Sequence, residues 1–223
     1  MGYRVIIAID GPAGVGKSTV AKLLAARLGY LYLDTGALYR AIAWNVLRSN
    51  IEPTDQDRVA ELLPSTSMQV QFQNGAMHVL VNERDITSEL RTPEVTAAAS
   101  IVSAIPAVRE WLLPIQRQIG QRGSVVAEGR DIGTKVFPSA PLKFFLDADA
   151  TVRAERRHRE LVSSGHEGPI ETTYQDLSGR DRRDRIRPIA PLIPAADARP
   201  IDTSAMNAEQ VVEQMMAAVS AVS

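Results

Sequence analysis

The feature that most constrains this sequence is a glycine-rich loop between an apolar stretch and a helical pattern. Tyr3–Ile9 is rich in β-branched residues and almost wholly apolar, which predicts a buried parallel strand. Residues 11–18 read GPAGVGKS and fit the pattern G-x-x-x-x-G-K-[ST] in full. Apolar residues then recur at helical spacing over Ser18–Leu28. A strand, this loop and a helix in that order predict an α/β chain that binds the phosphates of a nucleoside triphosphate.

The chemistry of this phosphate loop gives its residues roles. Its glycines allow backbone N–H groups to surround a phosphate, and the helix N-terminus adds positive charge. Lys17 is expected to bridge the β- and γ-phosphates, and Ser18 to ligate Mg²⁺. Thr19 is expected mainly as a helix-start residue with a minor phosphate contact. The expected nucleotide-binding residues are Gly11, Pro12, Ala13, Gly14, Val15, Gly16, Lys17, Ser18 and Thr19.

Strand-like and helical segments alternate along the rest of the chain. Further strands are predicted at Tyr30–Leu33, Ser124–Ala127, Leu142–Leu146 and Ala198–Ile201. Helices are predicted at Gly36–Leu47, from Thr54, at Pro93–Ser103, Pro106–Gly120, Thr151–Gly165, Thr172–Arg187 and Asn207–Val222. This alternation predicts three layers, with a parallel five-stranded sheet between helices.

One segment departs from this alternation. Met68–Phe72 and Met77–Val81 both read as strands, and Asn74-Gly75 between them is a strong hairpin signal. An antiparallel hairpin in an otherwise α/β chain predicts a small insert at about residues 63–92.

Composition excludes some kinds of site. The chain has no Cys, which excludes disulfides, thiolate catalysis and Cys-ligated zinc, and its three His are far apart in sequence. A formal net charge of -1 argues against a surface that coats nucleic acid. No secretory signal is recognised, and no apolar run approaches the roughly 18 residues of a membrane span. We therefore expect a cytoplasmic monomer without nucleic-acid or membrane partners.

The phosphate loop alone leaves three classes open: a kinase for a small acceptor, a GTPase-type switch, and a motor or assembly ATPase. A guanine-reading Asn-Lys-x-Asp motif is absent from the sequence. The segment Val125–Glu128 is only a loose match to the acidic strand expected of an assembly ATPase.

Two polar segments favour an acceptor that carries a phosphate. Residues 34–40 read DTGALYR, so a helix is expected to begin near Gly36 with Thr35 as its cap and Arg40 one turn later. A helix N-terminus, a hydroxyl and an arginine together suit a phosphate group. Residues 128–133 read EGRDIG and follow a predicted strand, where doubly wound sheets bind their ligands.

A third segment is unusually rich in arginine. Residues 153–187 contain nine Arg, seven Asp or Glu and no Lys. The pair Asp181 and Arg185 fits a solvated helix face. Arg180, Asp184 and Arg187, however, share one face at spacings of four and three. Such a face can close over a transferring phosphoryl group, which predicts a helical lid.

Taken in order, these motifs resemble those of the bacterial cytidylate kinases, a branch of the P-loop nucleoside monophosphate kinases. The resemblance covers nearly the whole chain, including the hairpin insert. It rests on residues 11–18, 34–40, 91–95, Ser100, 108–110, 128–133, 136–138, 145–148, 180–187 and 190–197. It implies transfer of the γ-phosphoryl group of ATP to CMP or dCMP, giving CDP or dCDP and ADP, with Mg²⁺.

The resemblance also implies roles for individual residues. Substrate-binding residues would be Thr35, Arg40, Ser100, Arg109, Arg130, Asp131, Asp184 and Arg187. Catalytic residues would be Lys17, Arg130, Arg180 and Arg187. Many relatives have Ser at the position of Thr35 and Gly at that of Ser18, so Ser18 here completes the phosphate-loop pattern.

The base assignment has independent chemical support. Cytosine offers a donor amine at C4 and acceptors at N3 and O2, so it needs an acceptor and donors opposite. Asp131 can accept from the amine, and Arg109 can donate to N3 or O2. Uracil instead has an acceptor at C4 and a donor at N3, so Asp131 would face a carbonyl. This mismatch predicts a preference for CMP over UMP.

The predicted organisation is a single P-loop kinase domain over residues 1–223. Its core comprises about 1–34, 121–150 and 188–223, its acceptor region with the insert about 35–120, and its lid about 151–187. Two alternatives remain: a P-loop kinase for another acceptor, such as UMP and CMP jointly or shikimate, and a nucleotide-binding switch that transfers nothing.

Overall fold

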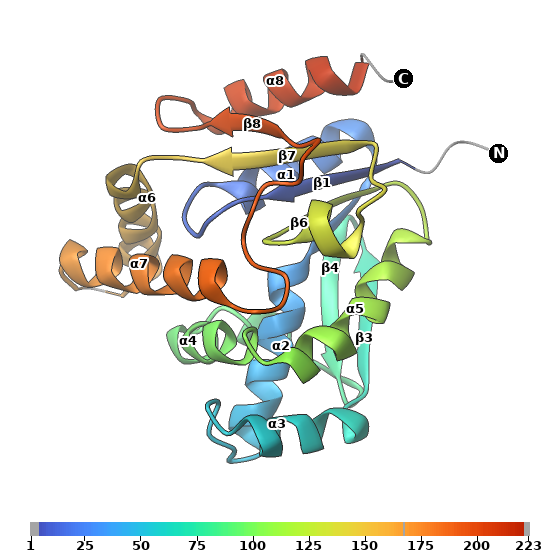
Figure 1. Ribbon diagram of the computed structural model, residues 1–223, viewed down its shortest axis with the longest axis vertical. Helices are drawn as coiled ribbons and strands as arrows, with labels where there is room; N and C mark the ends of the chain where they lie inside the picture. The colour runs from blue at the N-terminus through green and yellow to red at the C-terminus, as the bar shows by residue number, and fades with distance from the viewer. Residues whose placement is uncertain (1–4, 167, 221–223) are drawn as a thin grey trace.

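Five parallel strands form the central sheet of the computed structural model, which describes residues 5–166 and 168–220 (Figure 1). They are β1 (Ile6–Asp10), β2 (Leu31–Asp34), β6 (Val125–Gly129), β7 (Leu142–Asp147) and β8 (Arg199–Asp202), in the spatial order β2-β6-β1-β7-β8. The predicted five-stranded parallel sheet is therefore confirmed. Because all five strands run the same way, their carboxyl ends share one edge of the sheet.

Helices cover both faces of this sheet, as predicted. On one face, α1 (Lys17–Leu28) and α8 (Ala208–Ser220) pack against alternate β1 residues such as Ile7 and Ile9. On the other face, α2 (Thr35–Arg48), α4 (Pro93–Val102) and α5 (Pro106–Gly120) share a core with Ala8. No single helix among the described residues is long and apolar enough to cross a membrane, whereas α4 and α5 pass that test only jointly, across a 101° bend.

The predicted insert is present, with one more strand than expected. It contains the antiparallel strands β3 (Met68–Gln73), β4 (Ala76–Val81) and β5 (Arg84–Asp85), and the helix predicted from Thr54 precedes it as α3 (Gln56–Leu62). Phe72 pairs with Met77 across the Asn74-Gly75 turn, as the hairpin signal indicates. Sequence patterning missed β5 because two residues are too short to show alternation.

The segment predicted as a lid forms two helices, α6 (Ala150–Ser163) and α7 (Ile170–Ile186), which lie side by side at the left of Figure 1 and are called the lid helices below. Helix α7 ends one residue earlier than predicted, so Arg187 lies in extended backbone just beyond it. Of the predicted elements, residues 3–4 of the first strand and 221–222 of the last helix lie outside the described residues, as does residue 167 of the lid. The boundaries given to core, acceptor region and lid stay predictions.

The hairpin turn generates a stability prediction. Gly75 has φ 77°, and Asn74 before it has φ 51°, so both occupy the left-handed region. Replacing Gly75 by Ala should lower the free energy of unfolding by about 1 kcal/mol, because a Cβ disfavours that backbone conformation. Thermal unfolding would measure the loss. Gly123→Ala is the control, because Gly123 lacks positive φ and an added Cβ meets nothing within 4 Å. Equal melting temperatures for the two variants would contradict this account of the turn.

Candidate active site

A cleft of about 680 Å³ lies at the carboxyl edge of the parallel sheet. The phosphate loop, the start of α2, helix α4, the end of β6 and the lid helices all contribute to it. It brings together most of the predicted residues: Ala13, Gly14, Gly16, Lys17, Ser18, Thr19, Thr35, Arg40, Ser100, Arg109, Arg130, Asp131, Arg180, Asp184 and Arg187. Gly11, Pro12 and Val15 are buried and are not part of its lining.

The phosphate loop places a buried ammonium group at the floor of the cleft. Lys17 is 5% exposed, and its Nζ donates to the carbonyl of Pro12 at 2.6 Å. Burial, together with the charge of Arg130, lowers the pKa of Lys17 to about 7. At the base of the loop, Gly11 has φ 153°, and a Cβ there would lie 2.2 Å from the carbonyl oxygen of Leu146. Only glycine lets the loop pass this close to β7.

A carboxylate of β6 lies in the same part of the cleft as the phosphate loop. Glu128 is 4% exposed and accepts a hydrogen bond from the Tyr32 hydroxyl at 2.7 Å. Both Glu128 and Ser18 line the cleft, and the charge of Glu128 acts on Lys17. Sequence reasoning had noted Glu128 only as a loose motif match and had given it no role. The parallel pairing of β1 with β6, which sets Glu128 opposite Ile9, is what brings it to the loop.

Besides the site of the Lys17 ammonium group, the cleft has a second cationic pocket, at the start of α2 beside Arg40. The cap predicted for this helix was wrong. The cap of this helix is Asp34 and not Thr35: Oδ1 of Asp34 accepts from the N–H of Ala37 at 3.0 Å. Thr35 is the first helical residue, and its hydroxyl donates to the carbonyl of Glu128 at 2.7 Å. The cap was misassigned because Asp and Thr are both good caps and stand side by side.

Asp34 also serves as counter-ion for two arginines. Its Oδ2 lies 2.7 Å from Nη2 of Arg40 and 3.3 Å from Nη2 of Arg91. Burial alone would raise the pKa of Asp34, but these two guanidinium groups hold that pKa below its usual value. Arg40 is therefore held at the edge of the cleft by an ionised carboxylate.

The loop after β6 is fixed by a buried carboxylate that sequence reasoning did not single out. Oδ1 and Oδ2 of Asp10 accept the N–H groups of Ile132 and Gly133, each at 2.8 Å. Burial raises the pKa of Asp10 to about 6 in spite of these hydrogen bonds. The residues that follow Asp131 form a five-residue π-helical turn, Ile132–Val136, which was also not predicted. The two hydrogen bonds to Asp10 hold the loop after β6, and with it Arg130 and Asp131, beside the phosphate loop.

Arg109 of α5 and Asp131, in the loop after β6, form a buried ion pair in the cleft. The two residues are 6% and 5% exposed, and Nη2 of Arg109 lies 2.6 Å from Oδ2 of Asp131. The guanidinium of Arg109 stacks 5.2 Å from the ring centroid of Tyr39. The other oxygen of Asp131 faces Nη2 of Arg187 at 3.6 Å. A carboxylate and a guanidinium are thus adjacent in the cleft.

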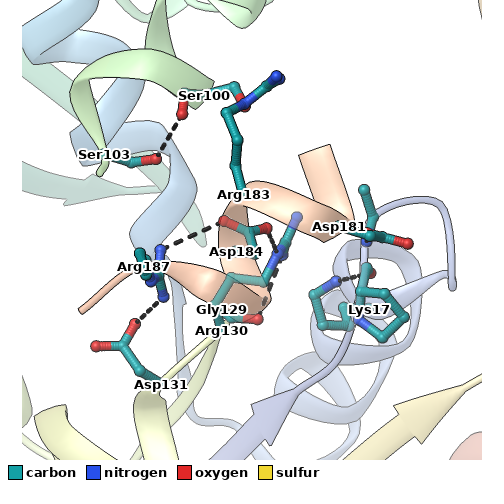
Figure 2. A network of polar contacts seen from close by, with 12 residues as sticks. Lys17, Ser100, Ser103, Gly129, Arg130, Asp131, Asp181, Arg183, Asp184 and Arg187 are labelled. Carbon is teal, nitrogen blue, oxygen red and sulfur yellow. Dashed lines mark hydrogen bonds and ion pairs between the residues drawn. The ribbon is translucent and has the colours of Figure 1, made fainter. Parts of the chain in front are cut away.

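Asp184 joins the lid to the loop after β6 (Figure 2). Its Oδ2 accepts from Nε of Arg130 at 2.8 Å, and its Oδ1 lies 3.3 Å from Nη1 of Arg187. Burial would raise the pKa of Asp184, but Arg130 and Arg187 lower it. Arg187 is 5% exposed and is therefore packed into the site.

Two contacts of α7 were not predicted. Asp181 was expected on a solvated face, but it is 6% exposed and forms an ion pair with Arg153 of α6. Arg183 reaches across to α4, where its Nη2 and Nε donate to the hydroxyl of Ser100 at 2.9 and 3.1 Å (Figure 2). Periodicity within one helix cannot reveal either contact, because both partners lie in other elements.

Three guanidinium nitrogens of this cleft are buried without a hydrogen-bond partner in the part of the chain that the structure describes. They are Nε of Arg40, Nε of Arg109 and Nη2 of Arg187. A buried donor without an acceptor costs about 1–3 kcal/mol, so such donors cluster where a ligand supplies the acceptors. The arrangement suits an anionic ligand with further acceptor atoms.

Comparison with known proteins identifies relatives along nearly the whole chain. The family profile described as cytidylate kinase matches residues 7–221. The cytidylate kinase of Carboxydothermus hydrogenoformans is 46% identical over 210 residues, which cover 94% of this chain and 95% of that protein. A bifunctional pantoate ligase/cytidylate kinase of Synechococcus elongatus is 48% identical over 96% of this chain. The chain spans only 42% of the length of that bifunctional relative.

One solved structure with a TM-score above 0.5 supports the fold. An uncharacterised protein from Eubacterium ventriosum superposes with a TM-score of 0.56 at 15% identity, covering 98% of this chain and 99% of that one. A gluconokinase from Sinorhizobium meliloti has a TM-score of 0.49 at 21% identity. Identities this low concern the fold alone.

The buried Arg109–Asp131 pair yields a prediction about stability. Arg109→Met should lower the free energy of unfolding by about 3 kcal/mol, because it leaves the carboxylate of Asp131 buried with only the more distant Arg187 as counter-ion. Urea unfolding would measure the loss. Arg182→Met, at an exposed position on α7, should change stability by no more than about 0.5 kcal/mol. A loss for Arg109→Met as small as that of the control would show that the pair is dispensable for folding.

Proposed function

Because the chain belongs to the cytidylate kinase family, we propose that it transfers the γ-phosphoryl group of ATP to CMP or dCMP. The products are CDP or dCDP and ADP. The observation that carries this proposal is the set of buried guanidinium nitrogens without acceptors, together with the buried Arg109–Asp131 pair in the same cleft as the phosphate loop. We further propose that the enzyme acts as a cytoplasmic monomer.

The phosphate loop is the proposed ATP side of the cleft. Backbone N–H groups of the loop and the N-terminus of α1 surround the β-phosphate. The Nζ of Lys17, which now donates to Pro12 within the loop, exchanges this carbonyl for the β- and γ-phosphates. Arg180 of α7 lines the same cleft and neutralises the equatorial oxygens of the phosphoryl group in transfer.

The second cationic pocket is the proposed site of the acceptor phosphate. Thr35, Arg40 and Arg130 surround it, and Nε of Arg40 is a buried donor without a partner. Phosphate oxygens supply the missing acceptor, and guanidinium groups bind them in a two-pronged manner. Asp184 and Arg187 lie where the ribose would join this phosphate to the base.

The Arg109–Asp131 pair is the proposed reader of the base. The free Nε of Arg109 donates to N3 or O2 of cytosine, and the Oδ1 of Asp131 accepts from the amine at C4. Ser100 completes this end of the cleft, with Arg183 bonded to its hydroxyl. Asp131 would face a carbonyl of uracil, which leaves two acceptors opposed.

The reaction needs no general base on the protein. An oxygen of the acceptor phosphate, already anionic, forms the new bond to the γ-phosphorus, and the bond between that phosphorus and the β-bridging oxygen breaks to release ADP. Alignment and charge neutralisation by Lys17, Arg130, Arg180 and Arg187 supply the catalysis.

Mg²⁺ fits the donor set beside the phosphate loop. The ion prefers oxygen ligands, commonly one or two carboxylates with substrate phosphates. The hydroxyl of Ser18 would hold it directly, and the carboxylate of Glu128 supplies a nearby negative charge. When bound, Mg²⁺ neutralises charge that develops on the β- and γ-phosphate oxygens.

A panel of acceptors tests the proposed function. ADP release from ATP should be stimulated by CMP and dCMP, and kcat/KM for CMP should exceed that for UMP by about tenfold or more, because uracil mismatches the buried Asp131. AMP and shikimate should give no stimulation. Equal kcat/KM values for CMP and UMP would contradict the base assignment, and nucleotide binding without acceptor-dependent turnover would favour a switch.

The pKa of Lys17 gives a second prediction. With a pKa of about 7 in the open cleft, Lys17 is mostly uncharged at pH 8, and polyphosphate should raise that pKa well above 8. Binding of a non-hydrolysable Mg·ATP analogue at pH 8 should therefore take up about one proton. Calorimetry in buffers of different ionisation enthalpy measures this uptake. At pH 6, where Lys17 is already charged, the uptake should vanish; equal uptake at both pH values would contradict the assignment to Lys17.

A further inference from the structure

The base of the lid is bonded to the phosphate loop by two buried side chains that the proposed reaction does not use. Oδ1 of Asp181, on α7, accepts from the N–H of Ala13 at 3.1 Å. Nη1 of Arg153, on α6, donates to the carbonyl of Ala13 at 3.0 Å and forms an ion pair with Asp181. Arg153 and Asp181 are 7% and 6% exposed. Both backbone groups of Ala13, a residue of the phosphate loop, are therefore held by lid side chains.

Close packing surrounds this junction. Ala13 forms a small buried cluster with Ala154 of α6 and Leu177 of α7. Leu177 and Asp181 are one turn apart on the same face of α7, so this face meets the loop through an apolar contact and a polar one. A Cβ at Gly14 would lie 3.0 Å from the carbonyl oxygen of Arg153. The loop and the two helices thus leave little room for one to move without the others.

Arg180, next to Asp181 in sequence, depends on this junction for its position. In the ranges that the structure describes, no hydrogen bond or ion pair fixes the guanidinium of Arg180. Arg130 and Arg187, by contrast, are held by Asp184. Arg180 lines the cleft, where burial and the charge of Arg130 lower its pKa to about 10. The position of Arg180 therefore depends on the backbone of α7, and Asp181 bonds that backbone to the phosphate loop.

We propose that Asp181, with Arg153, is a positioning residue that fixes Arg180 relative to the phosphate loop. The loop holds the phosphates of ATP and Arg180 meets the group in transfer, so the junction sets the distance between the two. In Figure 2, Asp181 lies beside the loop that carries Lys17. This inference rests on the proposed function, because it assigns Arg180 to phosphoryl transfer from ATP.

The test is a double-mutant cycle between Asp181 and Arg180. Asp181→Asn keeps the size of the side chain and an oxygen for the N–H of Ala13, but it removes the charge that faces Arg153. Its kcat should fall by about 10- to 100-fold, because misplacing a catalytic group by about 1 Å has effects of that size. The Kd for CMP should change much less than kcat, because the residues proposed for the acceptor phosphate, Thr35, Arg40 and Arg130, lie outside α6 and α7. Asp181→Asn should have no further effect on kcat in an Arg180→Ala background.

Controls separate positioning from a general effect on folding. Arg182→Ala, at an exposed position of the same helix, should leave kcat unchanged. Circular dichroism gives the folded fraction, and kcat is expressed per folded molecule. If Asp181→Asn does not fold, Arg153→Lys is used in the same cycle, because it retains the charge but cannot form all the bonds of the guanidinium.

Two outcomes overturn the inference while leaving the proposed function intact. One is a wild-type kcat for the folded Asp181→Asn enzyme. The other is a loss that multiplies with that of Arg180→Ala, which would mean that Asp181 acts independently of Arg180. Absence of CMP-dependent turnover in the wild-type protein would instead overturn the proposed function, and the role of Asp181 with it.

Discussion

The parallel pairing of β1 with β6 is the constraint on which the whole site depends. It sets Ile9 opposite Glu128 and Asp10 opposite Gly129, so the phosphate loop and the loop that carries Arg130 leave the sheet side by side. Asp10 then locks the two together through the N–H groups of Ile132 and Gly133. Were the register different by one residue, these side chains would point to the opposite face of the sheet. Sheet geometry, therefore, decides where donor and acceptor phosphates could meet.

Buried charge is the second organising influence. Asp34, Asp131 and Asp184 each accept from or face arginines inside the cleft, and each is largely removed from water. Guanidinium groups in low-dielectric surroundings need such partners, since an isolated buried charge is strongly unfavourable. These carboxylates do not accept from all of the buried guanidinium N–H groups, however. The N–H groups that remain mark where the acceptor atoms of a ligand would bind. A net charge of -1 for the whole chain is therefore compatible with a cleft that holds many buried charges of both signs.

Sequence reasoning predicted the parts of this protein that depend on local pattern. The phosphate loop, the five parallel strands, the Asn74-Gly75 hairpin and the family were all confirmed. Features that depend on partners distant in sequence were missed or wrong. Asp181 was expected on a solvated face because Arg153 is 28 residues away, and Asp10 was not singled out because Ile132 is 122 residues away. The roles of individual site residues stay predictions, since geometry shows only that they converge.

Asp34 has two roles, as helix cap and as counter-ion, and together they bear on turnover in the proposed reaction. The same carboxylate caps α2 and pairs with Arg40, so Arg40 is already ordered before a phosphate arrives. In the proposed reaction, little side-chain entropy is then lost on binding. The phosphate of the proposed reaction would bind the free Nε, so Asp34 can keep Nη2 while substrate is bound. After a diphosphate product departed, Arg40 would still have a counter-ion, and the emptied cleft would not hold an unpaired buried charge there.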